Sequence, residues 1–299
     1  MKKNIPLSMI FYRNFLLLIV IPILIIIIFT MGIIQKIMLK SSIEKIQLAQ
    51  NNIKTTLESE ILDTSLRLTH FLLTNDNQVL EYAAKYNLSQ GEDKYIYNVR
   101  LKEQFNLMMM PKTDILAIHF YMNDGSQYDL KDNLNLSSEY IKNSKWYQEA
   151  LNKQKLTYIG SEISNITISQ SRRMNPKLTL AVALAPGSLD RYKKIEMVCM
   201  YVQSKTTNMV EEYNKRSELG EMYLIDGTGS ILIGKNREEI LEVPNHILLK
   251  GSGVYKQKME HTIFNYIISN VDDTDWKIVN IAETDELLSV FYQISLGII

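Results

Sequence analysis

The chain has little of several residues that mark common classes of protein. Its 299 residues include one cysteine, Cys199, and four histidines, and lysine plus arginine equals aspartate plus glutamate at 33 each. A single cysteine cannot form an intrachain disulfide, and this one lies in the apolar run 197–202, as a buried small side chain does. A chain with zero net charge lacks the positive field of nucleic-acid-binding proteins, so we expect no nucleic-acid partner.

Motifs for catalysis or metal binding are also lacking. The histidines are far apart in sequence, and none has a cysteine or carboxylate at metal-ligand spacing. Residues 229–235 have the glycine and lysine spacing of a phosphate-binding loop, but Asn236 follows where serine or threonine is needed, and 230–233 is bulky like a strand. Residues 272–275 lack the glycine and glutamate of a calcium loop. We therefore expect no enzyme activity, cofactor or metal site in this chain.

Long apolar runs lie at both ends. Residues 15–34 are 20 residues without a charge, which matches the ~20 residues needed to cross a bilayer and exceeds the ~7–15 of a cleaved signal peptide. We predict a transmembrane helix at 15–34, with 1–14 as a cytoplasmic N-terminus. A second uncharged run, 287–299, has 13 residues and no closing polar flank. We interpret it as the truncated start of a second transmembrane helix.

These two spans predict a multi-pass protein of the cell membrane, with the lipid bilayer as a partner. Lys2, Lys3 and Arg13 precede the first span, but Lys36, Lys40 and Lys45 follow it, so the charge of the flanks only weakly sets the orientation. We place the N-terminus inside and the segment between the spans on the extracytoplasmic side.

Residues 35–75 predict a stalk helix. The stretch from Gln35 to Leu73 contains no glycine or proline, and some 38 helical residues extend about 57 Å. Apolar residues recur at spacings near three, four and seven, at Ile43, Ile46, Ile53, Leu57, Ile61, Leu68 and Phe71. This seam either forms a coiled coil with a second copy or packs on the chain's own domain, and the sequence leaves both open. We expect a homodimer.

From about residue 114 the pattern changes to short apolar runs with period two, separated by turn residues. We predict strands at 115–121, 127–130, 156–163, 178–184, 196–203, 222–225, 230–233, 253–257, 262–269 and 276–281, with helices at 137–152 and 207–215. The fold class is therefore α+β, an antiparallel hairpin-linked layout appearing twice, at 76–206 and 207–286, with helices expected on one side of each sheet.

Three motifs in this order carry a family resemblance. They are the strand and turn Met222-Tyr-Leu-Ile-Asp-Gly-Thr-Gly-Ser-Ile-Leu232, the late strand Asp275-Trp-Lys-Ile-Val-Asn-Ile281, and the helix Trp146-Tyr-Gln-Glu-Ala150. Together with the opening span and stalk they resemble a double Cache domain. The resemblance implies two stacked PAS-like modules outside the membrane, a membrane-distal one at 76–206 with a ligand pocket and a membrane-proximal one at 207–286.

The Phe15-Leu-Leu-Leu-Ile-Val-Ile-Pro22 anchor is most similar to that of YesM-type sensor histidine kinases. This narrower resemblance implies a ligand-sensing input region whose missing output domain acts on a cytoplasmic response regulator. AraC-type regulators, chemoreceptors and diguanylate cyclases carry similar input domains and stay open as alternatives. So does a different class, a membrane-anchored protein that senses nothing and only docks a partner.

One departure from the family pattern concerns the ligand. Amino-acid-binding members place an arginine two residues before the Trp-Tyr pair, where its fork holds the ligand carboxylate. Here that position is Ser144, with Lys145 beside it, and residues 201–204 lack the aspartate that would hold an amine. The resemblance therefore implies a small-molecule ligand other than an amino acid.

Candidate pocket residues are the aromatic side chains on the strands and helix that would frame a cavity in the distal module. They are Tyr121, Tyr128, Trp146, Tyr147, Tyr158 and Tyr201. Each is also a good core residue, so packing competes with ligand contact at these positions. Arg172 and Arg173 either bind an anion or lie in a solvated loop.

Overall fold

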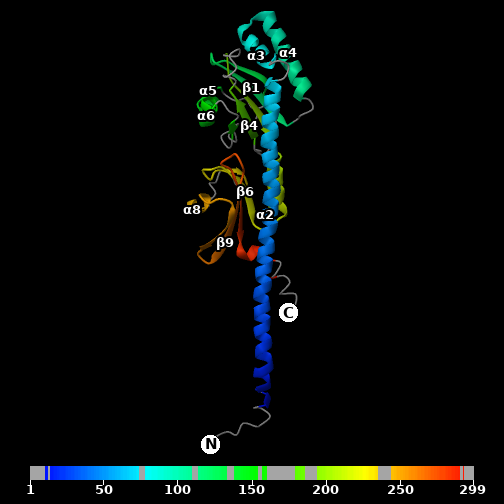
Figure 1. Ribbon diagram of the computed structural model, residues 1–299, viewed down its shortest axis with the longest axis vertical. Helices are drawn as coiled ribbons and strands as arrows, with labels where there is room; N and C mark the ends of the chain where they lie inside the picture. Colours follow the sequence, from blue (N-terminus) through cyan, green and yellow to red (C-terminus); the bar gives the residue numbers. More distant parts are fainter. Residues whose placement is uncertain are drawn as a thin grey trace.

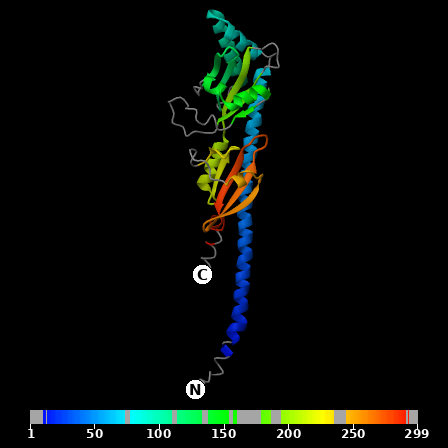
Figure 2. The ribbon, with the colours of Figure 1, turned by 90° about the vertical axis from the view of Figure 1, so that its left-hand side faces the viewer.

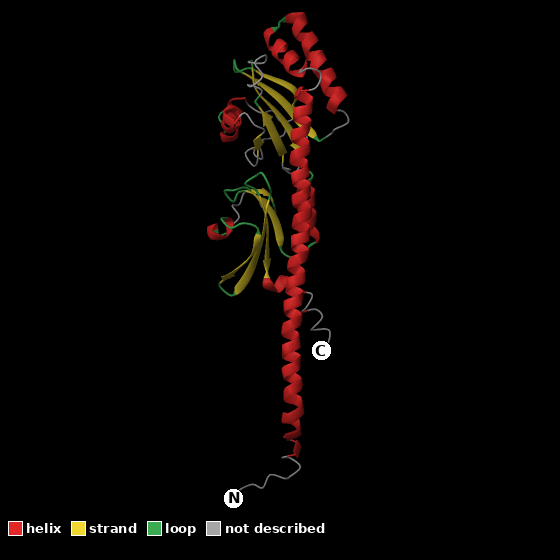
Figure 3. Ribbon diagram, in the orientation of Figure 1, coloured by secondary structure: helices red, strands yellow, loops and turns green. Residues whose placement is uncertain are grey.

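The computed structural model describes residues 11–12, 14–73, 78–109, 114–132, 138–153, 157–159, 179–185, 194–234, 244–289 and 292. The fold is α+β, as expected: one long helix runs along one side of two antiparallel sheets that follow one another along its length (Figures 1 and 2). Figure 3 shows the two sheets in yellow beside the red helix. The expected module limits at 76, 206 and 286 stay predictions.

The long helix is α2, Ile21–Leu73, and a π-helical turn, η1 at Leu16–Val20, leads into it. Pro22 lies two residues after this turn, and proline removes one backbone donor and disturbs the preceding turn. Within the described residues, one helix is apolar and long enough to cross a membrane: Leu16–Leu73, with a mean hydropathy of 3.2 in its most apolar window and none of that window buried.

The seam of α2 packs on the chain's own sheets. Ile46, Ile53, Leu57 and Ile61 lie in the core of the proximal module, and Leu68 and Phe71 lie in the core of the distal module. This answers the question that the sequence left open about the seam. Gln50 is also buried on this face, where its side-chain amide donates to the carbonyls of Ile267 at 2.7 Å and Ile278 at 3.3 Å.

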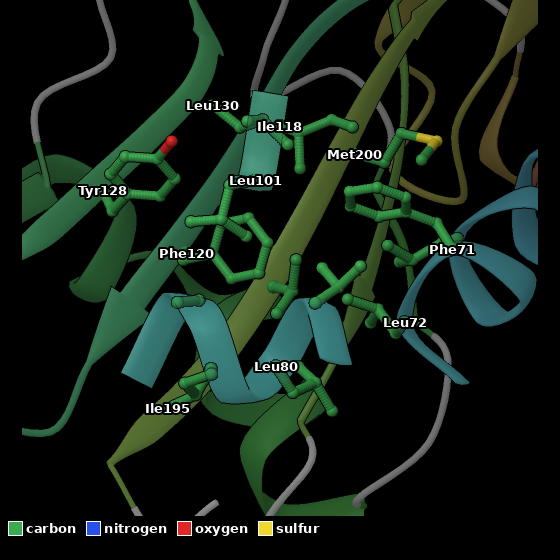
Figure 4. Close-up of a cluster of buried hydrophobic side chains, with 14 of the residues drawn as sticks. Phe71, Leu72, Leu80, Leu101, Ile118, Phe120, Tyr128, Leu130, Ile195 and Met200 are labelled. Atoms are coloured by element: carbon green, nitrogen blue, oxygen red, sulfur yellow. The ribbon is translucent and has the colours of Figure 1, made fainter. Parts of the chain in front are cut away.

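The distal module has a five-stranded antiparallel sheet in the order β2-β1-β5-β4-β3. Its strands are β1 Ile115–Met122, β2 Gln127–Asp132, β3 Thr157–Ile159, β4 Thr179–Leu184 and β5 Ile195–Gln203. One face packs against α2 and the hairpin of α3, Gln78–Leu88, and α4, Gly91–Met109, with Phe71, Leu80, Leu101 and Phe120 in the core (Figure 4). The opposite face is covered by α5, Ser138–Lys142, and α6, Lys145–Lys153.

The proximal module repeats the same strand order, β7-β6-β10-β9-β8. Its strands are β6 Glu221–Ile225, β7 Ile231–Ile233, β8 Gly253–Met259, β9 Thr262–Asn270 and β10 Lys277–Glu283. Helix α7, Thr206–Arg216, shares one face with α2, while α8, Asn245–Leu248, packs on the other, and α9, Thr284–Leu287, follows β10. Helices thus lie on both faces of each sheet, so the expectation of one covered side was wrong.

Both modules open with the same kind of hairpin turn. In the distal module the carboxylate of Asp124 accepts the backbone N–H of Ser126 at 2.9 Å and its hydroxyl at 2.6 Å. In the proximal module Asp226 accepts from the N–H groups of Thr228 and Ser230, both at 2.9 Å. An aspartate that satisfies the amides two residues on stabilises such turns, and the glycine in each turn supplies the positive φ that other residues avoid.

Two helical features differ from the expectation. The sequence signalled no helix between 76 and 113, where α3 and α4 form the tip of the molecule (Figure 1). The single helix expected at 137–152 is two helices, because the chain turns at Asn143 and Ser144. The carbonyl of Ser144 accepts the N–H of Gln148 at 3.4 Å, and serine favours such helix starts. Most of the expected second membrane helix, 287–299, lies outside the described residues.

Candidate functional site

The candidate site is the face of the distal sheet beneath α5 and α6. Because side chains alternate along a strand, Tyr121 on β1 and Tyr201 on β5 point toward this face, while their neighbours point into the core under α2. Trp146 and Tyr147, on α6, pack against this face. The residues that complete the cluster are mostly small or apolar: Ala117, Ile141, Ala150, Ala183, Met197 and Cys199.

A buried polar chain crosses this face. His119 Nδ1 lies 3.3 Å from the Tyr121 hydroxyl, which lies 3.4 Å from the Tyr201 hydroxyl. All three side chains are fully buried. His119 Nε2 faces the carboxylate of Asp129 on β2 at 3.7 Å, since the two residues are direct partners in the β1–β2 register. The chain supplies hydroxyl and imidazole groups that both donate and accept hydrogen bonds.

The aromatic rings stand at angles to one another. Tyr121 meets Tyr147 edge to face at 5.6 Å between centroids, and Trp146 meets Tyr147 at 5.8 Å. The imidazole of His119 lies 5.2 Å from the Tyr201 ring. Edge-to-face pairs are favourable geometries for aromatic rings, so these contacts add to the packing of the buried cluster.

A charged pair lies at the border of the cluster. The Tyr147 hydroxyl donates to Glu196 Oε2 at 2.9 Å, and Lys142 Nζ lies 3.1 Å from the same oxygen. Lys142 and Glu196 are each about a quarter exposed, so water reaches both. A single carboxylate oxygen thus orders a phenol from α6 and an ammonium from α5.

Burial keeps the deeper groups of the cluster neutral. It raises the pKa of the Tyr201 phenol well above its ordinary value, and it raises the pKa of Tyr147, to which the hydrogen bond with Glu196 adds. Burial also raises the pKa of the Cys199 thiol, against a smaller opposing effect of its hydrogen bond with Tyr201. At neutral pH these groups are hydrogen-bonding phenols and an inert thiol rather than anions.

The structure brings together four of the six residues named from the sequence: Tyr121, Trp146, Tyr147 and Tyr201. Tyr128 lies on the opposite face of the sheet, in the core under α2, where its hydroxyl donates to Asn98 at 3.0 Å. It is therefore separated from the cluster by the sheet. The side chain of Tyr158 and both Arg172 and Arg173 lie outside the described residues.

Sequence reasoning missed three polar members of this site, His119, Lys142 and Glu196. His119 had a usable signal, because it stands two residues before Tyr121 on an alternating strand and must share its face. Lys142 and Glu196 lie 54 positions apart in sequence, and only the pairing of β5 beside β1 brings them together.

Ser144, which stands where the family's arginine was expected, is committed to a structural role. Its hydroxyl donates to the carbonyl of Ile141 at 2.5 Å, within the turn between α5 and α6. No guanidinium occupies this part of the described site.

No protein-family model matches the chain, and no curated protein matches its sequence. Among solved structures, the ligand-binding domain of Mlp24 with asparagine has a TM-score of 0.55 at 13% identity, covering 84% of this chain and 96% of that one. The ligand-binding domain of the Campylobacter jejuni chemoreceptor Tlp3, with L-norvaline, has a TM-score of 0.52 at 14% identity, covering 84% and 94%. The Pseudomonas aeruginosa chemoreceptor PctC domain, with GABA, has a TM-score of 0.50 at 12% identity, covering 79% and 95%.

The chain therefore has the fold of the Cache-type sensor domains of chemoreceptors. At these identities the likeness establishes the fold alone.

Proposed function

We propose that this chain is the extracytoplasmic, ligand-sensing and signal-transducing input region of a membrane receptor. The observation that carries the proposal is one continuous helix, α2, that joins an uncharged, membrane-length segment to the cores of both sheet modules. A ligand that prefers one arrangement of the distal module would shift that helix by no more than its difference in affinity for the two states. The neighbours' own functions, as ligand-binding domains of chemoreceptors, support this reading.

The ligand in this proposal is a small polar molecule held by the neutral phenols and the aromatic edges of Tyr121, Tyr147 and Tyr201. The Tlp3 and Mlp24 domains were solved with L-norvaline and asparagine, and a guanidinium fork suits the carboxylate of such ligands. This site instead offers Ser144, already hydrogen-bonded to Ile141. The proposal therefore favours ligands without an obligatory carboxylate, such as sugars, polyols or heterocycles.

The experiment is a thermal-shift screen of the full chain in lipid nanodiscs with amino acids, sugars, polyols and nucleobases. A binding compound should raise the unfolding temperature, and by mass action 100 times its Kd adds about 2.7 kcal/mol. Tyr147→Phe should abolish or weaken that shift. Tyr266→Phe is the matched control, since Tyr266 is equally buried on the corresponding face of the proximal sheet.

A compound whose shift survives Tyr147→Phe but is lost in Tyr266→Phe would move the binding site to the proximal module. A screen in which no class of compound binds would favour the alternative, a membrane-anchored docking protein that senses nothing.

The output attached to this input is proposed as a histidine kinase with a cytoplasmic response regulator, because the membrane anchor resembles that of YesM-type kinases. A chemoreceptor is the second candidate, because the structural neighbours are ligand-binding domains of chemoreceptors. AraC-type regulators and diguanylate cyclases are further alternatives. The coding sequence beyond Ile299 decides among them. A kinase would continue with a histidine-bearing dimerisation helix and an ATP-binding domain, and a chemoreceptor with a coiled-coil signalling hairpin. A regulator would continue with a DNA-binding domain, and a cyclase with a cyclase domain.

A homodimer is part of the same proposal. Four leucines on the face of α2 opposite the buried seam are 47–64% exposed: Leu48, Leu62, Leu66 and Leu73. They are 14, 4 and 7 residues apart in turn, which fits the repeat of a helix–helix seam. A single Leu62→Cys substitution should form a disulfide-linked dimer in membranes on mild oxidation, because equivalent residues meet on a two-fold axis. Glu218→Cys, on an exposed loop, should not. Equal cross-linking of both would argue against this face.

A further inference from the structure

The joint between the two modules is held by one carboxylate of the long helix. Residues 204–206 connect the end of β5 to the start of α7. Glu60 on α2 accepts the Ser204 hydroxyl at 2.6 Å, the Thr206 hydroxyl at 2.9 Å and the backbone N–H of Lys205 at 2.8 Å. The side chains of Ser204 and Thr206 are buried. All three bonds go to one carboxyl group, and hydrogen bonds to a carboxylate are shorter and stronger than those between neutral groups.

This joint lies directly after the candidate site in the chain. Tyr201 faces the aromatic cluster, and Ser204 follows three residues later, about 10 Å along an extended strand. β5 is paired on both sides, with β1 and with β4, so it has little freedom to bend. A displacement of Tyr201 along the strand would therefore reach Ser204 nearly undiminished.

A second contact ties the same end of the sheet to the same helix. The Gln203 N–H donates to the carbonyl of Asp114 at 2.9 Å, and the carboxylate of Asp114 binds Arg67 at 2.9 Å. Arg67 also pairs with Asp63 on its own helix. Glu60 and Arg67 are two turns apart on α2. Thus β1 begins and β5 ends beside one short segment of α2.

We propose that Glu60 is the positioning residue that couples the distal site to the long helix, so that movement of β5 is transmitted to α2 through the joint 204–206. This rests on the proposed sensing function for its biological meaning, but the coupling itself is a property of the apo chain. Glu60 holds the joint in one position on the helix. Without that carboxylate the two buried hydroxyls lose their acceptor, and the joint 204–206 is no longer fixed to α2.

The experiment measures hydrogen exchange of the full chain in lipid nanodiscs, read at α2 residues 50–62. Tyr201→Leu perturbs the end of β5 from the site side. It should raise exchange in 50–62 by about tenfold in an otherwise unchanged chain, since local openings follow lost contacts. In the Glu60→Ala background the same substitution should add less than about twofold. Glu60→Gln, which still offers an oxygen to Lys205, should restore part of the transmitted effect.

Tyr266→Leu on the proximal sheet is the control and should behave the same with or without Glu60. If Tyr201→Leu does not fold, Tyr201→Phe removes only the hydroxyl, with its contacts to Tyr121 and Cys199, and should give a smaller effect of the same pattern. An effect of Tyr201 on α2 that is undiminished in Glu60→Ala, or absent altogether, overturns the proposal. Either result leaves the ligand screen, and with it the proposed function, untouched.

Discussion

The two faces of α2 give a matched test of how the long helix is held. Leu57 is fully buried in the proximal core, whereas Leu62, five residues later on the same helix, is 59% exposed. Replacing either leucine by alanine changes helix propensity equally and slightly. The difference between the two variants therefore reports packing alone.

Leu57→Ala should lower the free energy of unfolding by about 2–5 kcal/mol, because it removes buried methyl groups and leaves a cavity between α2 and the sheet. At roughly 2–4 °C per kcal/mol, that lowers the melting temperature by about 4–20 °C. Leu62→Ala, measured on the monomer diluted in detergent micelles so that the proposed dimer face stays uncovered, should change stability by less than about 0.5 kcal/mol.

The chain contains its own reporters for this experiment. Each module has one tryptophan, Trp146 in the distal and Trp276 in the proximal module, and both are buried. Unfolding followed by fluorescence in Trp146→Phe and Trp276→Phe backgrounds therefore reports on each module separately. In Leu57→Ala, the unfolding transition reported by Trp276 should come before the one reported by Trp146. Equal effects of Leu57→Ala and Leu62→Ala would refute the packing of the seam on the chain's own modules.

Three further predictions follow from individual contacts. Hydrogen bonds from Ser126 lower the pKa of Asp124 to about 2, so the ionised Asp124 stabilises the fold above its ordinary pKa near 4, and this stabilisation is lost as the pH falls through about 2. NMR titration of the carboxyl group measures this pKa, and Asp124→Asn should abolish the pH dependence. Gly220→Ala should destabilise the proximal module by about 1–3 kcal/mol in thermal unfolding, because φ is +82° and an added Cβ would lie 2.3 Å from the Ile281 carbonyl oxygen; no change in melting temperature would contradict this. Gln50→Leu should cost about 1–3 kcal/mol by leaving two buried carbonyls without their side-chain donor, and an unchanged melting temperature would show that those carbonyls do not depend on it.

The regular elements were predictable because their signals are local. The recurrence of Ile46, Ile53 and Leu57 on one helical face and the period-two alternation of Tyr121 and its neighbours placed α2 and the strands within a few residues. The turn at Asp226 was equally clear, because its side chain bonds to residues only two and four positions away. Local hydrogen bonds and periodicity depend on residues that are close in the sequence, so they can be predicted from it.

The site was only partly predictable because it depends on pairing between distant segments. Tyr121 and Tyr128 looked equivalent in the sequence, but Tyr128 pairs with Phe120 and therefore shares the face opposite to that of Tyr121. Glu196 reaches Lys142 only because β5 lies beside β1. The α3–α4 hairpin was missed for a related reason: α4 has no strong apolar face in its sequence, and a few contacts such as Leu101 with the distal core hold it.

We propose that the two sheet modules lie across the membrane from the N-terminus. The lone native cysteine makes the direct test clean, because Cys199 is buried and burial raises the pKa of its thiol. Single cysteines at Glu218, on an exposed loop, and at Lys3 should be treated with a membrane-impermeant maleimide on intact cells and after lysis. We expect Glu218→Cys to react in intact cells and Lys3→Cys only after lysis, and the reverse pattern would contradict the account.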